Sequence, residues 1–142
     1  MTSPATFSWH EGEETVDINL PDVKAEVEAL HDRYEAALMA NDTETLQAMF
    51  WNSPHTIRYG IGENLYSWEE IGMFRSARSP VGLARSISRT RITTFGRDAA
   101  TASTLFERAS APGKIGRQMQ TWVRMPEGWR IVAAHVSVID VV

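Results

Sequence analysis

Arg58 is the first residue whose type and setting suggest chemistry. It lies in the segment HTIRYGIGENLY, which runs from His55 to Tyr66 and begins as a short strand of β-branched and aromatic residues. A guanidinium matches a carboxylate in shape and binds it through two charge-assisted hydrogen bonds. Two interpretations stay open: Arg58 pairs with an acidic residue from early in the chain, or it binds a ligand near Asn64 and the neighbouring glycines.

Arg75 and Arg78 are a second pair of basic candidates. The capping box SWEE predicts a helix that starts at Trp68 and ends before Pro80. Spacings of three, four and seven residues place both arginines on the same helix face as Phe74. A charge on an apolar face is costly unless it meets an anion, so we expect both arginines to face a pocket. A solvated helix face is the alternative.

Polar residues near the C-terminus are further candidates for lining a pocket. Gln118, Gln120 and Trp122 share one face of a predicted strand by the period-two rule. His135 alternates in the same way with Trp129 on the last predicted strand. A lone histidine is more often structural, so His135 either faces the pocket or packs in the core.

Tyr34 lies on the apolar stripe of the first predicted helix. Leu20-Pro21-Asp22 predicts the start of this helix and Asn41 its end, after which Asp42 or Thr43 begins a second, shorter helix. The stripe recurs at helical spacing and consists of Val23, Val27, Leu30, Tyr34, Ala37 and Leu38. A tyrosine on such a stripe usually belongs to the core, so the residues alone favour a structural role for Tyr34.

The C-terminal half predicts a sheet that positions these side chains. From Ala84 onward, Thr, Ile, Val and aromatic residues alternate with turn signals. We expect four antiparallel strands at about 84–95, 99–109, 114–125 and 129–140. Three helices followed by this meander predict an α+β fold, a cone in which the curved sheet wraps the helices and leaves a pocket between them.

Other chemistries lack the residues that they need. The chain has no cysteine, so thiolate metal sites and cysteine nucleophiles are excluded. His55 and His135 are not at metal-ligand spacing, and neither HxH nor HExxH occurs. The serines show no nucleophile elbow, and the segment GIG is too short for a dinucleotide loop. We therefore expect no metal and no cofactor.

Length and composition indicate one domain. The chain has 142 residues, of which 43% are hydrophobic, and this is enough for a single core. Residues 1–18 are polar and acidic, so we expect a flexible N-terminal arm before a domain over residues 19–142. No apolar run approaches the roughly 20 residues that cross a bilayer, and the N-terminus does not resemble a signal peptide. We expect a cytoplasmic protein with no membrane partner.

Charge is distributed unevenly along the chain. Residues 1–54 contain eleven acidic residues against Lys24 and Arg33, whereas the remainder carries an excess of basic residues. Six arginines fall between Arg75 and Arg97. They are interleaved with apolar residues and the net charge is −4, so we expect a small anionic ligand and no nucleic acid.

Several strings along the chain resemble one known family. INLPDV, RYEAAL, TIRYGIGENLY, FRSARSP, GLARS and GRQMQTWVRMPEGWRIVAAHVS are similar to the AtzH/HpxZ-like family, in the SnoaL-like branch of the NTF2-like superfamily. The similarity extends from Ile18 to about Ile139. It implies an NTF2-like cone, with three N-terminal helices packed in a curved, mainly antiparallel sheet.

The resemblance also implies an activity. AtzH removes an N-carboxyl group from 1,3-dicarboxyurea, leaving allophanate and carbon dioxide, in cyanuric acid (s-triazine) catabolism, whereas the HpxZ relatives accompany oxalurate breakdown. These strings do not separate the two groups. The functional tyrosine of the RYE motif falls on Tyr34 and the functional arginine of the RYG motif on Arg58, which reverses the structural interpretation of Tyr34. Residues 1–18 depart from the family pattern.

We therefore expect a cofactor-independent enzyme that decarboxylates a small, anionic urea derivative. Tyr34 would donate a proton to the leaving nitrogen, and Arg58, helped by Arg75, would hold a carboxylate. The further substrate-binding candidates are Arg78, Asn64, Gln120 and His135.

Two alternatives stay open. The chain is either a noncatalytic, dimeric binding or accessory protein for an amidohydrolase, or a hydrolase in which Tyr34 and Arg58 activate water. Ligand binding without turnover indicates the first, and ammonia rather than carbon dioxide as product indicates the second. We also expect a homodimer through the outer face of the sheet, because residues 131–142 supply more apolar side chains than one core needs.

Overall fold

The structure, a computed structural model, describes residues 5–10 and 14–141. Its helices are α1 (Pro21–Met39), α2 (Thr43–Met49) and α3 (Trp68–Ala77). They begin where the capping signals predict. The side chains of Asp42 and Ser67 each accept a hydrogen bond from a backbone N–H three residues further on, which caps α2 and α3.

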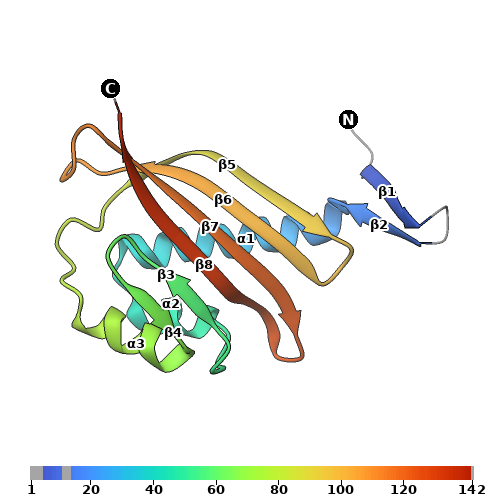
Figure 1. Cartoon of the computed structure of the whole chain (residues 1–142), viewed down its shortest axis with the longest axis horizontal. Helices are drawn as coiled ribbons and strands as arrows, with labels where there is room; N and C mark the ends of the chain where they lie inside the picture. The colour runs from blue at the N-terminus through green and yellow to red at the C-terminus, as the bar shows by residue number, and fades with distance from the viewer. Residues whose placement is uncertain (1–4, 11–13, 142) are drawn as a thin grey trace.

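In the described residues, eight strands form one curved sheet (Figure 1). They are β1 (Ala5–His10), β2 (Glu14–Ile18), β3 (Ile57–Tyr59), β4 (Asn64–Tyr66), β5 (Ser86–Phe95), β6 (Ala99–Glu107), β7 (Lys114–Met125) and β8 (Gly128–Asp140). Their order is β1-β2-β5-β6-β7-β8-β3-β4. All neighbours are antiparallel except β3, which runs parallel to β8. The predicted meander of four long strands and the α+β class are confirmed.

The N-terminal segment forms a hairpin that local sequence patterns did not predict, and the flexibility expected of residues 1–18 stays a prediction. β1 and β2 pair as an antiparallel hairpin, and Ile18 of β2 pairs with Phe95 of β5. Asn19 then takes a left-handed conformation, with φ 59°, and its side-chain oxygen accepts a hydrogen bond from the Thr94 backbone N–H at 2.9 Å. Strand formation here depends on pairing with the edge of a distant strand, which local propensity does not report. Residues 1–4 and 11–13 lie outside the described residues, and the domain boundary at residue 19 stays a prediction.

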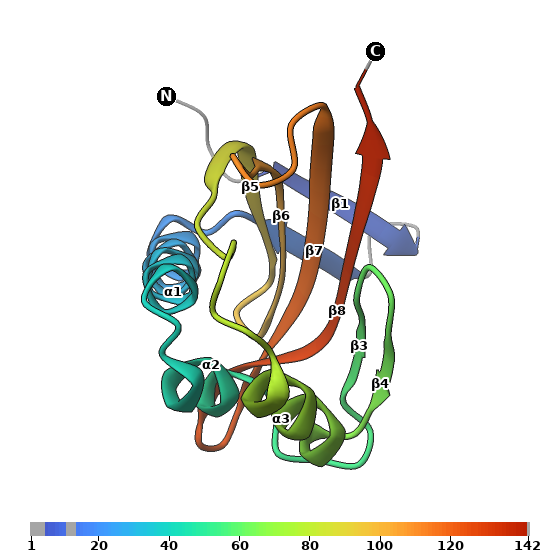
Figure 2. The ribbon, with the colours of Figure 1, turned by 90° about the vertical axis from the view of Figure 1, so that its left-hand side faces the viewer.

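The core lies between the helices and one face of the sheet, and Figure 2 shows the three helices grouped along that side. Its largest fully buried hydrophobic side chains, from both helices and strands, are Leu46, Phe50, Ile71, Trp122 and Ile131. α1 contacts β5 and α2 contacts β8, so the helices line the concave side over much of its width. In the described part of the chain, no helix combines the length and hydrophobicity needed to span a bilayer.

A β-bulge in β8 changes which of its residues face the core. Consecutive residues of β7 oppose Ile131 and Ala133, so Val132 is the extra residue. Ile131 is buried, but after the bulge the buried positions are Ala134 and Val136. Every side chain beyond Val132 therefore faces the side opposite to the one that strict alternation predicts.

Candidate functional site

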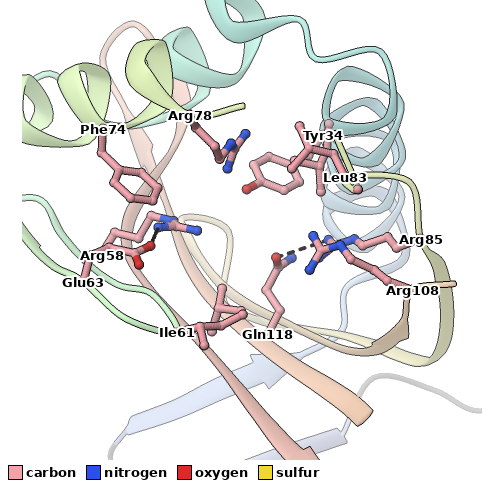
Figure 3. A pocket seen from close by; sticks show the side chains of 13 residues that line it. Tyr34, Arg58, Ile61, Glu63, Phe74, Arg78, Leu83, Arg85, Arg108 and Gln118 are labelled. Carbon is pink, nitrogen blue, oxygen red and sulfur yellow. Dashed lines mark hydrogen bonds and ion pairs between the residues drawn. The ribbon is translucent and has the colours of Figure 1, made fainter. Parts of the chain in front are cut away.

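A cavity of about 220 Å³ lies between α1, the end of α3 and the inner face of the sheet (Figure 3). It is lined by Tyr34, Leu38, Arg58, Ile61, Glu63, Phe74, Arg78, Gly82, Leu83, Arg85, Arg108, Gln118 and Val136. Four of these are arginines, which come from β3, the end of α3, the segment before β5 and the segment after β6. The cavity is thus a place where distant parts of the chain bring like charges together.

Tyr34 lies on the face of α1 that packs against the sheet and is only 3% exposed. Its ring lies 6.5 Å from that of Phe50, centre to centre, and Figure 3 shows its hydroxyl pointing into the cavity. Burial by itself would raise the pKa of the phenol. The positive charges of Arg75, Arg58 and Arg85 outweigh burial and lower that pKa below its ordinary value of 10.0. The phenol is therefore both enclosed and unusually acidic.

Arg58 enters the cavity from β3 and is largely buried. Its Nη1 donates a hydrogen bond to Glu63 Oε2 at 3.0 Å, and its guanidinium carbon lies 5.7 Å from the ring centre of Phe74. A Cβ at Gly60 would come within 1.8 Å of the same Glu63 oxygen, so a glycine there lets the carboxylate reach Arg58. Arg58 thus has an acidic partner, but this partner is the nearby Glu63 and not an acidic residue from early in the chain. Arg58 also lines the cavity, and ligand binding by it stays a prediction.

Arg75 and Arg78 take the inward positions that their helix spacing predicts. Arg75 is 3% exposed and lies with its guanidinium carbon 5.3 Å from the ring centre of Phe50, behind the cavity wall. Arg78 caps the C-terminus of α3 and lines the cavity itself. Burial lowers the pKa of Arg75, and burial with the charges of Arg75 and Arg58 lowers the pKa of Arg78 to about 10. Both cations are buried, and neither has a carboxylate partner among the described residues.

Arg85, Arg108 and Gln118 form the opposite wall of the cavity (Figure 3). Arg85 forms a two-pronged ion pair with Glu35 of α1, in which Nε donates to Oε1 at 3.0 Å and Nη2 donates to Oε2. Arg85 Nη2 also donates to Gln118 Oε1 at 3.2 Å. The guanidinium carbons of Arg85 and Arg108 lie 4.5 and 4.7 Å from the ring centre of Phe106. Burial and the charge of Arg85 lower the pKa of Arg108.

The charges around the cavity do not balance among the residues that the structure describes. Arg58 and Arg85 each have a carboxylate partner. Arg75, Arg78 and Arg108 have none, and buried nitrogens of all three find no hydrogen-bond partner in the described part of the chain. Buried cations without partners are costly for stability, and such groups gather where a ligand of opposite charge binds. The arrangement suits a small anion that accepts several N–H donors and one phenolic hydrogen bond.

Four of the predicted substrate-binding residues do not line this cavity, and one of them is Arg75, which lies behind its wall. Asn64 is exposed, because β4 buries the residue that follows it. Gln120 lies on the predicted face of β7 but is enclosed in the core, where its Oε1 accepts a hydrogen bond from Trp122 Nε1 at 3.1 Å. His135 lies beyond the bulge in β8, so it faces outward, with its ring 5.9 Å from that of Tyr59. The bulge is the physical reason that alternation misplaced this histidine.

Sequence reasoning missed Glu63, Arg85 and Arg108 as cavity residues. The arginine cluster of residues 75–97 was a signal for Arg85, and alternation along the predicted strand at 99–109 was a signal for Arg108, which lies two residues beyond the buried Phe106. Glu63 reaches Arg58 only because the β3–β4 hairpin folds back on itself. In the region that the structure describes, no group of three or more His, Cys, Asp or Glu side chains is placed to hold a metal ion.

Comparison with known proteins gives a consistent family assignment. A family model described as AtzH-like matches residues 16–141. A crystal structure from the DUF3225 family of Pectobacterium atrosepticum is 57% identical and superposes with a TM-score of 0.84, covering 87% of this chain and 95% of its own. A cystatin-like fold protein from Burkholderia xenovorans is 47% identical, with a TM-score of 0.85, and covers 89% and 99%.

More distant structures share the fold alone. An NTF2-like protein from Pseudomonas putida is 14% identical with a TM-score of 0.67, covering 82% of this chain and 86% of its own. The predicted NTF2-like architecture is therefore confirmed. No curated protein sequence matches the chain at a significant level.

Proposed function

Since the chain belongs to the AtzH-like family, we propose that it is a cofactor-independent decarboxylase of a small carboxylated urea. The substrate would be 1,3-dicarboxyurea, converted to allophanate and carbon dioxide. The observation that carries this proposal is the buried Tyr34 phenol, which faces a cavity where arginines outnumber carboxylates among the described residues. Removal of an N-carboxyl group requires at least a site that binds the anion and a proton donor beside it.

In the proposed step, the bond between the carboxyl carbon and the urea nitrogen breaks. Its electron pair stays on the nitrogen, carbon dioxide leaves, and Tyr34 donates its hydroxyl proton to that nitrogen. The product keeps one carboxylate, and water returns a proton to the tyrosinate. The lowered pKa of Tyr34 suits this role, because a more acidic phenol transfers its proton at a lower cost.

The arginines serve two purposes in this proposal. Arg58 and Arg78 bind and orient the anion, while their charge, with that of Arg75 behind the wall, stabilises the negative charge that develops on the urea as the carboxylate departs. Leu38, Phe74 and Val136 supply apolar surface beside them. An apolar wall favours the loss of carbon dioxide, because it solvates the charged carboxylate poorly, whereas the carbon dioxide that leaves is neutral and needs little solvation.

Replacing Tyr34 with phenylalanine tests the proton donor. We expect carbon dioxide release to fall by roughly 10²–10⁴ fold, the usual contribution of a positioned acid, while the melting temperature stays close to that of the parent. Tyr66→Phe is the matched control, because Tyr66 is an exposed tyrosine on β4 that does not line the cavity. Full activity in Tyr34→Phe removes this residue from the mechanism.

Arg58→Lys tests the guanidinium fork, since lysine keeps the charge but cannot form paired hydrogen bonds. We expect a loss of carbon dioxide release of about tenfold or more. Measuring ammonia in the same assay separates decarboxylation from hydrolysis of an amide bond. An unchanged rate in a folded Arg58→Lys protein would count against the role given to this residue.

A noncatalytic binding function is the second candidate. Arg75, Arg78 and Arg108 have no carboxylate partner within residues 5–10 and 14–141, and their charges support anion binding whether or not a reaction follows. Calorimetric binding of a urea-type dicarboxylate with no release of carbon dioxide or ammonia would favour this function over the enzyme.

We also propose that two copies of the chain associate through the outer face of β7 and β8. Met119 and Ile139 are exposed hydrophobic side chains on these strands, and Val141 follows them. Apolar side chains exposed together on a sheet face favour association with a like surface. Sedimentation at micromolar concentration tests this: a mass of twice the chain supports the proposal and a monomeric mass defeats it.

A further inference from the structure

The proposed proton transfer does not use Arg108 or Gln118, which lie on the wall of the cavity opposite Arg58. Figure 3 shows Arg58 and Glu63 on one side of the cavity and Arg85 and Arg108 on the other, with Gln118 beside Arg85. A substrate held only at its reacting end would need none of the second group. The contacts of this wall indicate what it binds.

The Glu35–Arg85 ion pair sets the orientation of the Gln118 amide. Arg85 is 2% exposed in its side chain, and two of its nitrogens donate to the Glu35 carboxylate. A guanidinium only donates hydrogen bonds, so the Gln118 atom at 3.2 Å from Arg85 Nη2 must be the amide oxygen. The amide nitrogen of Gln118 is then committed to some other acceptor.

That acceptor is not found among the described residues. Gln118 is 4% exposed and its Nε2 is buried without a hydrogen-bond partner. A buried N–H donor without a partner lowers the stability of the fold by about as much as a lost hydrogen bond. Gln118 lines the cavity, so a ligand oxygen bound there would accept the hydrogen bond from Nε2.

Arg108 adds a charge to the same wall. Its Nε is buried and has no hydrogen-bond partner in the described part of the chain. Its neighbour Arg85 is already neutralised by Glu35, whereas Arg108 has no carboxylate of its own there. The wall therefore presents one uncompensated cation and one neutral N–H donor, which together match a carboxylate.

We infer that Arg108 and Gln118 form a second carboxylate subsite, so that the cavity selects dianions over monoanions. This inference rests on the proposed function for the place of the reacting carboxylate, on the Arg58 side. Glu35 and Arg85 are positioning residues, because they act through Gln118. After carbon dioxide leaves, the product carries one carboxylate instead of two, so it is held at one subsite only and departs more readily.

Calorimetry with glutarate and butyrate tests the subsite. Glutarate separates its two carboxylates by the same number of chain atoms as 1,3-dicarboxyurea and cannot lose carbon dioxide in this way, and butyrate lacks the second carboxylate. We expect glutarate to bind at least about tenfold more tightly, the value of one charge-assisted hydrogen-bonded contact. Equal affinity for the two ligands would overturn the inference.

Arg108→Gln should remove the preference for glutarate and leave butyrate affinity within about twofold of the parent. Arg117→Gln is the matched control, because Arg117 precedes Gln118 on β7 but is exposed on the opposite face of the sheet. If Arg108→Gln does not fold, Gln118→Glu replaces it: the added carboxylate pairs with Arg108 and repels a second one, so glutarate binding should fall by at least about tenfold. A preference for glutarate that survives in the folded variant contradicts the subsite.

The calorimetric result is independent of the proposed decarboxylation, because neither glutarate nor butyrate reacts. A glutarate preference without any decarboxylation of 1,3-dicarboxyurea supports the subsite and rejects the enzyme. Decarboxylation without a glutarate preference supports the enzyme and rejects the subsite. Tyr34→Phe provides a further check, because it should retain the glutarate preference while it loses turnover.

Discussion

Helix α1 lines two hollows of this molecule, and the two differ in volume and in charge. The C-terminal half of α1 lines the 220 Å³ arginine cavity, and its N-terminal half lines a wider groove of about 560 Å³ against β5. The groove is lined by Asn19, Lys24, Glu28, His31, Asp32, Thr90, Arg91, Ile92 and Thr93. Space alone would favour the groove as the functional site.

Charge distinguishes the two hollows. In the groove, Lys24 and Arg91 face Glu28 and Asp32 in equal number, and Lys24 Nζ donates to Glu28 Oε2 at 2.8 Å. The cavity has three more cations than anions among the described residues around it. A balanced polar surface is stable when empty, whereas crowded like charges are costly until an anion arrives. Uncompensated charge therefore favours the cavity as the proposed site, although the groove is larger.

Reversing one charge in each hollow gives the largest expected contrast. Arg78→Glu should lower carbon dioxide release by about a hundredfold or more, because it turns an anion-binding cation into a repelling anion. Arg91→Glu makes the same change in the groove and should leave the rate within about twofold. Equal losses in both variants would mean that general surface charge, and not the cavity, attracts the substrate.

Replacing Arg75 should stabilise the empty protein. Arg75→Met keeps most of the side-chain volume and removes a buried cation that lacks a hydrogen-bond partner in the described chain, which we expect to add about 1–3 kcal/mol to the free energy of unfolding. Chemical denaturation without ligand measures this change. Arg91→Met, at an exposed arginine of the groove, should change stability by less than about 0.5 kcal/mol. A destabilised Arg75→Met would show that this cation is better compensated than its contacts indicate.

The same substitution should move the pH dependence of the reaction. The proposed acid is the neutral phenol of Tyr34, so kcat/KM should fall as pH rises through a pKa below the ordinary 10.0. Arg75 is the charge that lowers this pKa most, so Arg75→Met raises the pKa and shifts the alkaline limb to higher pH. An alkaline limb that stays in place would separate Tyr34 from the limiting ionisation.

The smallest effect is expected in the groove. Burial lowers the pKa of His31 below 6.5, against the opposing charges of Glu35 and Asp32 and with a smaller contribution from Arg85. The unfolded chain then binds a proton before the folded chain does, so stability is lost as pH falls from about 6.5 through the lower folded pKa. His31→Leu should flatten this fall in melting temperature by a few degrees. An identical pH dependence in both proteins would show that His31 does not titrate in this range.

Local sequence patterns predicted most of the fold. Pro21, Asp42 and Ser67 mark helix starts by rules that act within a single turn, and they do so here. The four long strands follow from alternation and turn residues in the same way. Four features escaped: the hairpin of β1 and β2, strand β4, the parallel pairing of β3 with β8, and the bulge at Val132. The parallel pairing and the bulge depend on how strands align with distant neighbours.

The sequence by itself determined the inward face of each helix, because Tyr34, Arg75 and Arg78 follow from a fixed period of 3.6 residues and the cost of exposing their apolar neighbours. Only the tertiary structure decided which polar groups share the cavity. Arg85 meets Glu35 across fifty residues, and Arg108 joins them from beyond the end of β6. Contacts between distant segments depend on how helices and sheet pack, and short-range spacing does not encode that packing.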